Sequence, residues 1–278
     1  MNNGNLYRYT AFSTDPKGGN PAGVWVGDTL PDATTMQRIA AEVGFSETAF
    51  VAPRNGQNRM IRYFSPEMEV PFCGHATIAT GVALGDLSGD GLYRLATQAG
   101  EVPVMVRSEN GLCQAALTSV EPTYEDADNQ LVTAALAALD WQASDLDLSI
   151  PPAKAYAGAW HLVLAVKSAE RLANLDYDFE ALKTLMQAER LITLQLIWRE
   201  SETVFHSRNP FPVGGVVEDP ATGAAAAALG GYLRNAGLVS TPVKLLIQQG
   251  ETMGRPSRLT VEIPATGGII VSGAAVPI

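Results

Sequence analysis

The residues with the clearest chemical potential lie in the segment 62–80, RYFSPEMEVPFCGHATIAT. It places the thiol of Cys73 and the imidazole of His75 at the start of a run of small and apolar residues that predicts a helix. The first turn of a helix leaves backbone N–H groups unpaired and carries partial positive charge, and Gly74 lets a ligand approach them closely. The segment therefore predicts a binding site for a carboxylate or phosphate, with titratable side chains beside it.

A carboxylate that could exchange a proton lies upstream, in the strand-like run FSETAFV at residues 45–51. Glu47 is flanked there by Phe45 and Phe50, and apolar surroundings raise the pKa of a carboxyl group toward neutrality. One such carboxylate can take a proton from one carbon and return it to another carbon of the same molecule. The residue types alone are equally compatible with a surface carboxylate on an edge strand.

A second loop of similar character, EDPATG at residues 218–223, precedes an alanine-rich helix predicted at 224–234. Asp219 stands before a proline at this helix start, where it can serve as an N-cap, as a site residue or as both. The two helix starts are about 147 residues apart, and QAGE at 98–101 recurs as QQGE at 248–251. These short matches suggest an internal duplication without establishing it. In a duplicated chain, each half would wrap a sheet around one helix, with both helix starts facing one cleft.

Hydrophobic periodicity predicts both helices and strands along the chain, which we divide into two halves. The first half is expected at 1–120, together with the last strand at about 265–278, and the second at 121–264, after the acidic stretch 121–128. Helices are expected after Asp32 as far as Gly44, after Cys73, and at 127–139, 179–188 and 224–234, with a loop at 210–215. Strands are expected at 6–12, 22–26, 45–51, 60–64, 92–96, 102–107, 112–117, 159–166, 191–198, 202–207, 243–248, 259–263 and 269–272.

Composition narrows the class of protein. The chain has 278 residues, of which 46% are hydrophobic and 17% charged, as in an ordinary globular protein. Its 19 basic and 29 acidic side chains give a net charge of −10, which disfavours nucleic acid or an anionic membrane as a partner. No apolar run approaches the ~18 residues of a membrane span. Two cysteines and a start, MNNGNLYRYT, without signal-peptide features favour a cytoplasmic location.

Four motifs occur together along the chain: NPAGV at 20–24, SETAF at 46–50, CGHAT at 73–77 and EDPATG at 218–223. In this order and spacing they resemble the PhzF (phenazine-biosynthesis-like) family over nearly the whole chain. The resemblance implies an α+β protein with the diaminopimelate-epimerase-like fold, in which two similar halves, each a mixed sheet or barrel around a central helix, have an active site between them. It also implies a cofactor-independent isomerase that works by proton transfer on a small anionic substrate, usually as a homodimer.

The resemblance also implies roles for single residues. Glu47 would be the catalytic acid and base, with His75 and Asp219 as further catalytic residues that line the site. One departure concerns position 224, where family members often have Ser and this chain has Ala, so a hydroxyl that would bind the substrate is missing and its identity stays open. The residues expected to bind the substrate are Asn20, Cys73, Gly74, Ala76, Thr222, Gly223 and Ala224.

Other readings stay open beside this one. Cys73 occupies the place of the first thiol of related two-thiol racemases, but its counterpart in the second half is read as Pro220 and Cys113 as a core residue, which disfavours that mechanism. A racemase or epimerase that uses one carboxylate, or a non-catalytic small-molecule binder, remains possible. No spacing of His, Cys, Asp and Glu resembles a metal site, so neither metal nor cofactor is expected. His161 and His206 are expected to be structural.

Overall fold

The computed structural model describes residues 4–98, 100–109 and 111–278, so Ala99 of the repeated QAGE sequence and the first three residues lie outside it. The chain divides into two compact units. Unit 1 is formed by Met1–Thr118 together with Ser272–Ile278, and unit 2 by Ser119–Val271. Both contain mixed sheets and few helices, which confirms the α+β class. No helix in the described residues is long and apolar enough to cross a membrane.

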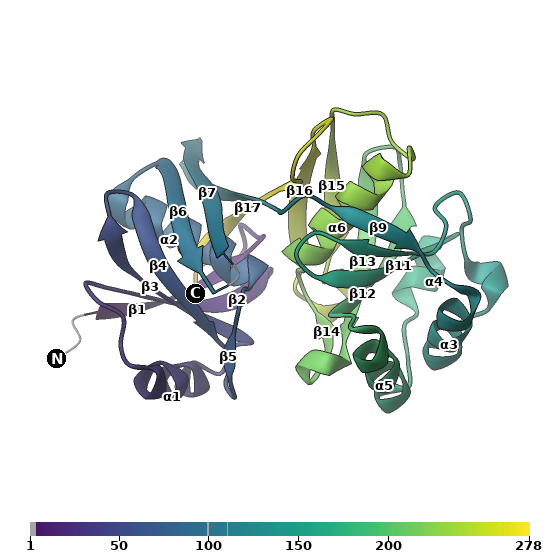
Figure 1. Ribbon diagram of the computed structural model, residues 1–278, viewed down its shortest axis with the longest axis horizontal. Helices are drawn as coiled ribbons and strands as arrows, with labels where there is room; N and C mark the ends of the chain where they lie inside the picture. The colour runs from purple at the N-terminus through teal and green to yellow at the C-terminus, as the bar shows by residue number, and fades with distance from the viewer. Residues whose placement is uncertain (1–3, 99, 110) are drawn as a thin grey trace. The chain divides into compact units, whose positions relative to one another are not determined.

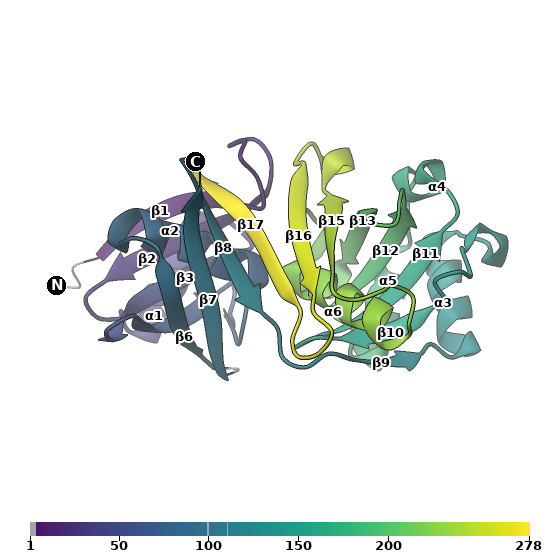
Figure 2. The ribbon, with the colours of Figure 1, turned by 90° about the horizontal axis from the view of Figure 1, so that it is seen from above.

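Unit 1 is a closed barrel, in which eight strands of the described chain pair in a ring around one helix, α2 (Gly74–Ser88) (Figure 1). The β2–β3 and β4–β6 pairs are parallel, and a two-residue strand, β5 (Glu69–Val70), pairs with β4. Around the ring, the strands are β1 (Gly4–Ala11), β2 (Asn20–Gly27), β3 (Glu47–Asn55), β4 (Asn58–Phe64), β6 (Gly91–Thr97), β7 (Gly100–Glu109), β8 (Leu112–Thr118) and β17 (Ile270–Pro277), which pairs with both β8 and β1 (Figure 2).

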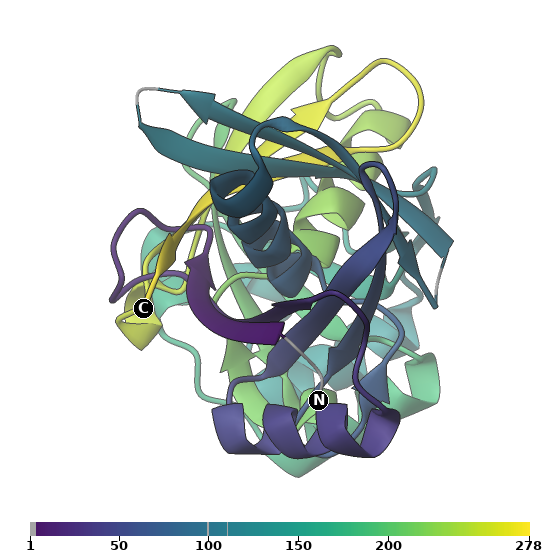
Figure 3. The same cartoon turned by 90° about the vertical axis from the view of Figure 1, so that its left-hand side faces the viewer.

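Helix α2 runs through the middle of this barrel (Figure 3), and its residues 75–84 are all buried. Small residues are required there because the strands approach closely. A Cβ atom added to Gly81 would lie 2.7 Å from the Cβ of Ala115 on β8, which is closer than two carbon atoms can pack. Outside the barrel, α1 (Ala33–Val43) has the predicted caps, with Asp32 at its N-terminus and Gly44 in the left-handed conformation at its end.

Unit 2 repeats the arrangement around α6 (Gly223–Asn235). Its strands pair in the order β9, β10, β11, β12, β13, β15 and β16, and β14 (Val216–Asp219) pairs with the end of β13. The other strands are β9 (Thr123–Asp126), β10 (Ala153–Tyr156), β11 (Trp160–Val166), β12 (Thr193–Arg199), β13 (Val204–Phe211), β15 (Val243–Gln249) and β16 (Ser257–Ile263). Around them are α3 (Asn129–Leu139), α4 (Ala169–Ala173), α5 (Phe179–Glu189), and the 3₁₀ turns η1 (Ala143–Asp145), η2 (Pro212–Gly214) and η3 (Glu251–Met253).

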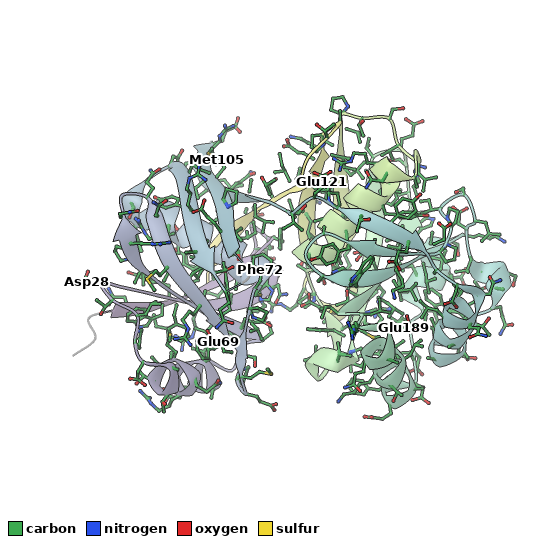
Figure 4. All side chains as sticks on the ribbon, in the orientation of Figure 1. Asp28, Glu69, Phe72, Met105, Glu121 and Glu189 are labelled. Carbon is green, nitrogen blue, oxygen red and sulfur yellow. The ribbon has the colours of Figure 1, made fainter. Side chains whose placement is uncertain are left out.

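The two units share one topology: elements β1 to β7 of unit 1, with α2 after β5, correspond in order to β10 to β16 of unit 2, with α6 after β14. An ion pair recurs at the same place. Arg62 on β4 forms a two-pronged pair with Glu69 on β5, labelled in Figure 4, and Arg208 on β13 does so with Glu218 on β14. In both units, the glutamate is the cross-strand partner of the residue two positions after the arginine, which is Phe64 in unit 1 and Pro210 in unit 2.

This topology corrects the alignment expected for the two helix starts. Cys73 is the N-cap of α2 and Thr222 the N-cap of α6, so equivalent positions are 149 residues apart. The counterpart of Cys73 is therefore Thr222, and the assignment to Pro220 was wrong. Pro220 and Ala221 instead lie in the connection between β14 and α6, because the chain needs that length to turn from the strand into the helix.

Some boundaries also differ from the expectation. The acidic stretch 121–128 contains strand β9, whose mostly exposed residues still pair with β10, a strand that periodicity did not indicate. Residues 210–215 are not one loop, since β13 continues to Phe211 and a 3₁₀ turn follows. Pro210 fits into β13 because the pairing with β14 shifts by a bulge there, where a missing N–H is tolerated.

Candidate active site

Strand register brings the first two predicted site residues of unit 1 to one end of the barrel. Glu47 is the first residue of β3 and pairs with Ala22 of the parallel strand β2, two residues after Asn20 begins that strand. Strand β4 runs antiparallel to β3 and its last residue, Phe64, pairs with Thr48, so the chain returns to this same end. From there it passes through β5 into the start of α2, carrying Cys73 with it.

Four polar side chains converge at this end. His75 Nε2 lies 3.4 Å from Oε2 of Glu47 and 3.3 Å from Oγ of Ser46. The Sγ atom of Cys73 lies 3.4 Å from Nδ1 of His75. The Ser46 hydroxyl and the Cys73 thiol also donate hydrogen bonds to the Glu47 carboxylate. The structure thus brings together the predicted catalytic residues Glu47 and His75 and Cys73, which was predicted to bind the substrate.

Burial sets the acid–base character of this cluster. The Glu47 side chain is only 15% exposed, and His75 and Cys73 are buried. Desolvation raises the pKa of the Glu47 carboxyl group above its usual range, because burial penalises the charged form, while the hydrogen bonds from Ser46 and Cys73 partly oppose that rise. A carboxyl group whose pKa is raised can bind and release a proton at a pH closer to neutrality. A role of Glu47 as general acid and base stays a prediction, and the raised pKa is compatible with it.

The start of α2 adds a place for an anion beside the cluster. Cys73 caps the helix without a hydrogen bond from its side chain to the first-turn amides, and no acidic residue lies in that turn. The amides at a helix start and the helix dipole attract negative charge. Gly74 is partly exposed there, whereas Ala76 is fully buried. Contact of Asn20, which is also buried, or of Ala76 with a substrate stays a prediction.

In unit 2, a second polar cluster forms where β14 meets α6. The Thr222 hydroxyl donates to Oδ2 of Asp219 at 2.6 Å, and its backbone N–H donates to Oε1 of Gln249 at 3.1 Å. The Gln249 amide donates in turn to the backbone oxygen of Asp219 and to the Thr222 hydroxyl, at 2.8 and 3.0 Å. Asp219 ends strand β14 and Thr222 is the N-cap, so Asp219 is not the cap itself. Gly223 and Ala224 are the first two residues of α6.

Sequence reasoning missed two members of these clusters. Ser46 contacts His75 and Glu47 but was not expected to act, although it stands beside Glu47 in its motif. Gln249 holds the Asp219–Thr222 turn, and the recurring QQGE sequence was the available signal for it. Of the lone histidines, His161 is buried and shares a hydrogen bond with Thr193, while His206 lies near the surface between Glu200 and Glu251.

Solved structures with this fold are PhzF-family proteins and epimerases. A phenazine biosynthesis protein of the PhzF family from Bacillus anthracis matches with a TM-score of 0.84 at 27% identity, over 98% of this chain and 96% of that one. A hydroxyproline epimerase from Agrobacterium vitis has the same fold, with a TM-score of 0.69 at 14% identity over 98% and 88% of the two chains. The molecule therefore has a fold of the diaminopimelate-epimerase-like class.

Sequence relatives then identify its family. The uncharacterized isomerase YfhB of Bacillus subtilis is 30% identical over 99% of this chain and 97% of its own length. Trans-2,3-dihydro-3-hydroxyanthranilate isomerase of Pseudomonas fluorescens is 34% identical over 89% of this chain and 86% of its own. The family model of phenazine biosynthesis-like proteins matches residues 9–278. The chain belongs to this PhzC-PhzF family.

Proposed function

We propose that this isomerase moves a proton between carbons of a small carboxylate-bearing molecule, with Glu47 as its general acid and base and without a cofactor. The observation that carries the proposal is the convergence of a mostly buried Glu47 carboxylate, the His75 imidazole and the α2 helix start at one end of the unit 1 barrel. A base beside an anion-binding helix start is the combination that abstraction of a proton next to a carboxylate requires.

The roles within the reaction follow from the contacts. Glu47 takes the proton from a substrate carbon, and the electron pair left behind spreads into the adjoining double bond or carboxyl group. Nε2 of His75 lies 3.4 Å from Oε2 of Glu47, so the imidazole can stabilise the negative charge that the carboxylate gains or loses with the proton. Glu47 then returns the proton to another carbon, so the product has the same atoms as the substrate.

We extend the proposal to unit 2 and to the assembly. Asp219 and Thr222, which hold each other at the start of α6, are proposed to contact the same substrate. A homodimer, which the family resemblance implies, and a cytoplasmic location, which the two cysteines and the N-terminal sequence favour, complete the proposal; light scattering on the purified protein tests the first. Conversion of Asp219 to Asn tests the second cluster, with an increased KM as the expected result.

Solvent exchange tests the central assignment. The wild-type protein is incubated in deuterium oxide with a panel of small carboxylates that includes trans-2,3-dihydro-3-hydroxyanthranilate, and deuterium incorporation is followed by mass spectrometry and NMR. We expect Glu47→Gln to reduce incorporation by about 10²- to 10⁴-fold, since it keeps the shape of the side chain and removes the base. Glu42→Gln changes an exposed carboxylate on α1 and serves as the matched control.

The position of the label separates the possible reactions. Deuterium at a carbon different from the one that lost its proton supports the proposed shift. Deuterium at the same carbon with inverted configuration would assign a racemase or epimerase instead. Undiminished incorporation by Glu47→Gln would contradict the role given to Glu47, and the absence of turnover on any substrate would favour a binding protein.

A further inference from the structure

The cluster around Glu47 has a second property. Three of its side chains carry atoms of the kinds that coordinate metal ions in proteins. One ligand atom each from Glu47, Cys73 and His75 lies within 4.8 Å of the other two. Glu47 is 26 positions before Cys73, so the spacing of these residues in the sequence does not indicate a metal site. Only the meeting of β3 with the start of α2 brings the three side chains together.

Two of the three separations are close to those of a tetrahedral zinc site. Zinc bonds of about 2.0–2.2 Å to nitrogen and oxygen and about 2.3 Å to sulfur place neighbouring ligand atoms roughly 3.4 to 3.6 Å apart in a tetrahedron. The distance from His75 Nε2 to Glu47 Oε2 is 3.4 Å, and that from His75 Nε2 to Cys73 Sγ is 3.9 Å. Sγ of Cys73 also lies 3.4 Å from Nδ1 of the same ring, so zinc bound at Nε2 requires the Cys73 side chain to rotate toward the Nε2 edge of the imidazole.

The chemistry of the donors selects the kind of ion. Thiolate and imidazole ligands favour Zn²⁺ and related transition-metal ions, whereas Mg²⁺ and Ca²⁺ prefer sets of oxygen atoms. Cys73 and His75 are buried and Glu47 is mostly so, which strengthens the attraction between a cation and the two groups that can be anionic. Three protein ligands leave the fourth zinc position to a water molecule or to an oxygen of a small molecule.

We propose that Glu47, Cys73 and His75 form a binding site for a single Zn²⁺ ion. Binding itself does not depend on the reaction proposed above, but its consequence does. With its carboxylate on the metal, Glu47 can no longer accept a proton from a substrate, so Zn²⁺ acts as an inhibitor. The residue that makes this chain sensitive is Cys73, whose equivalent in unit 2 is Thr222, a poor ligand for zinc.

Cobalt substitution tests the site directly. The full-length protein is titrated with Co²⁺ alone and followed by absorption spectroscopy, and bound Co²⁺ is then displaced with Zn²⁺. We expect saturation at one equivalent, a thiolate-to-cobalt charge-transfer band in the near ultraviolet, and visible bands of the intensity typical of four-coordinate cobalt. Cys73→Ala should lose the charge-transfer band and at least about tenfold in affinity, since even outer-shell changes at metal sites cost that much.

The other thiol provides the matched control. Cys113→Ala removes a partly buried thiol on β8 and should bind Co²⁺ with the wild-type spectrum and affinity. Cys73→Ser, with circular dichroism of both Cys73 variants, separates loss of a ligand from loss of the fold. Absence of saturable binding, or equal affinity in the folded Cys73→Ala and Cys113→Ala proteins, would overturn the proposal.

The activity measurement is kept apart from the binding measurement. Zn²⁺ should inhibit deuterium incorporation with a half-maximal concentration that matches its dissociation constant in the cobalt competition. Zinc bound through Cys73 together with undiminished incorporation would support the metal site and would instead contradict the role proposed for Glu47. The two proposals therefore fail in different ways.

Discussion

The two units place different side chains at the same points of one topology. The Phe50–Arg62 pair of β3 and β4 corresponds to the Leu196–Arg208 pair of β12 and β13, and three residues earlier in each first strand stand Glu47 and Thr193. On the neighbouring parallel strand, Glu47 faces Ala22 and Thr193 faces His161. A carboxylate beside a small residue in unit 1 is thus replaced by a hydroxyl beside an imidazole in unit 2.

In unit 2 these polar groups bind one another. His161 Nδ1 lies 2.8 Å from the Thr193 hydroxyl, and the side-chain amide of Asn209 donates to that hydroxyl and to Oε1 of Gln195. All four side chains are buried, and their hydrogen bonds lie within unit 2, although Nε2 of His161 and Nε2 of Gln195 have no partner among the described residues. Unit 1 instead keeps Glu47 partly exposed, which the role proposed for it requires, since a general base must reach its substrate.

The helix starts of the two units also differ in the side chains that they carry. His75 is the second residue of α2, and Ala224 is the second residue of α6. The imidazole that contacts Glu47 in unit 1 thus has no equivalent in unit 2. The two units thus share the backbone arrangement of the helix start, while the imidazole in contact with a carboxylate belongs to unit 1.

Exchange of the equivalent residues is the strongest test of this comparison. Glu47→Thr gives unit 1 the residue of unit 2 and should reduce deuterium incorporation by about 10²- to 10⁴-fold, because no general base remains. The fold should persist, since Glu47 is not in the hydrophobic core. Activity is measured by solvent exchange and stability by thermal unfolding; wild-type rates in this variant would place the base elsewhere.

The repeated ion pair distinguishes the units by burial. The side chains of Arg208 and Glu218 are 13% and 4% exposed, against 30% and 22% for Arg62 and Glu69. Arg208→Gln leaves a carboxylate buried without its partner and should lower the free energy of unfolding by about 3–5 kcal/mol. Arg62→Gln should cost only about 1 kcal/mol. Urea unfolding of both variants measures the difference, and equal losses would contradict the ranking by burial.

The buried histidine predicts a pH dependence of stability. Desolvation lowers the pKa of His161 from 6.5 to about 3, and a hydrogen bond with the backbone of Thr193 opposes that shift only in part. Between those two values the unfolded chain binds a proton that the folded chain does not, so stability is full above pH 6.5 and falls with decreasing pH. The loss is about 1.4 kcal/mol for each pH unit in that window.

A substitution assigns this slope to His161. His161→Gln removes the titrating group and keeps a hydrogen-bonding partner for Thr193. Thermal unfolding of both proteins between pH 6.5 and pH 5 should therefore show a shallower decline for the variant. An unchanged slope would mean that other groups account for the pH dependence.

The smallest expected effect concerns the residue equivalent to Asn209, which is Tyr63 in unit 1. Its hydroxyl lies 2.7 Å from the Thr77 hydroxyl, and both residues are buried. Tyr63→Phe removes one hydrogen bond and should lower the free energy of unfolding by about 1 kcal/mol. Asn209→Ala leaves several buried partners unsatisfied and should cost more. Urea unfolding compares the two, and the opposite order would show that the Asn209 network contributes little.

Features that depend on a short stretch of sequence were predicted from the sequence alone. The caps of α1 at Asp32 and Gly44 were predicted because capping residues act within a few positions. Glu47 and His75 were found through their motifs, and the structure brings them into contact. The fold class followed from the resemblance, which the comparisons confirm.

The remainder depends on contacts between residues that are distant in the sequence. His161 and Thr193 are 32 positions apart, and each looks ordinary in its own strand. The Glu47, Cys73 and His75 donor set has no recognisable spacing for the same reason. The pairing of Cys73 with Pro220 was wrong because sequence similarity of two short loops does not reveal where a helix begins.

The last strand, β17, has a consequence for the order in which the protein is made. It belongs to the unit 1 barrel, although all of unit 2 precedes it in the chain. During synthesis the first 118 residues therefore emerge as an unfinished barrel, with β1 and β8 lacking the neighbour that lies between them. Unpaired strand edges promote aggregation, so a chain truncated just before β17 would be much more prone to aggregate than its small loss of length suggests.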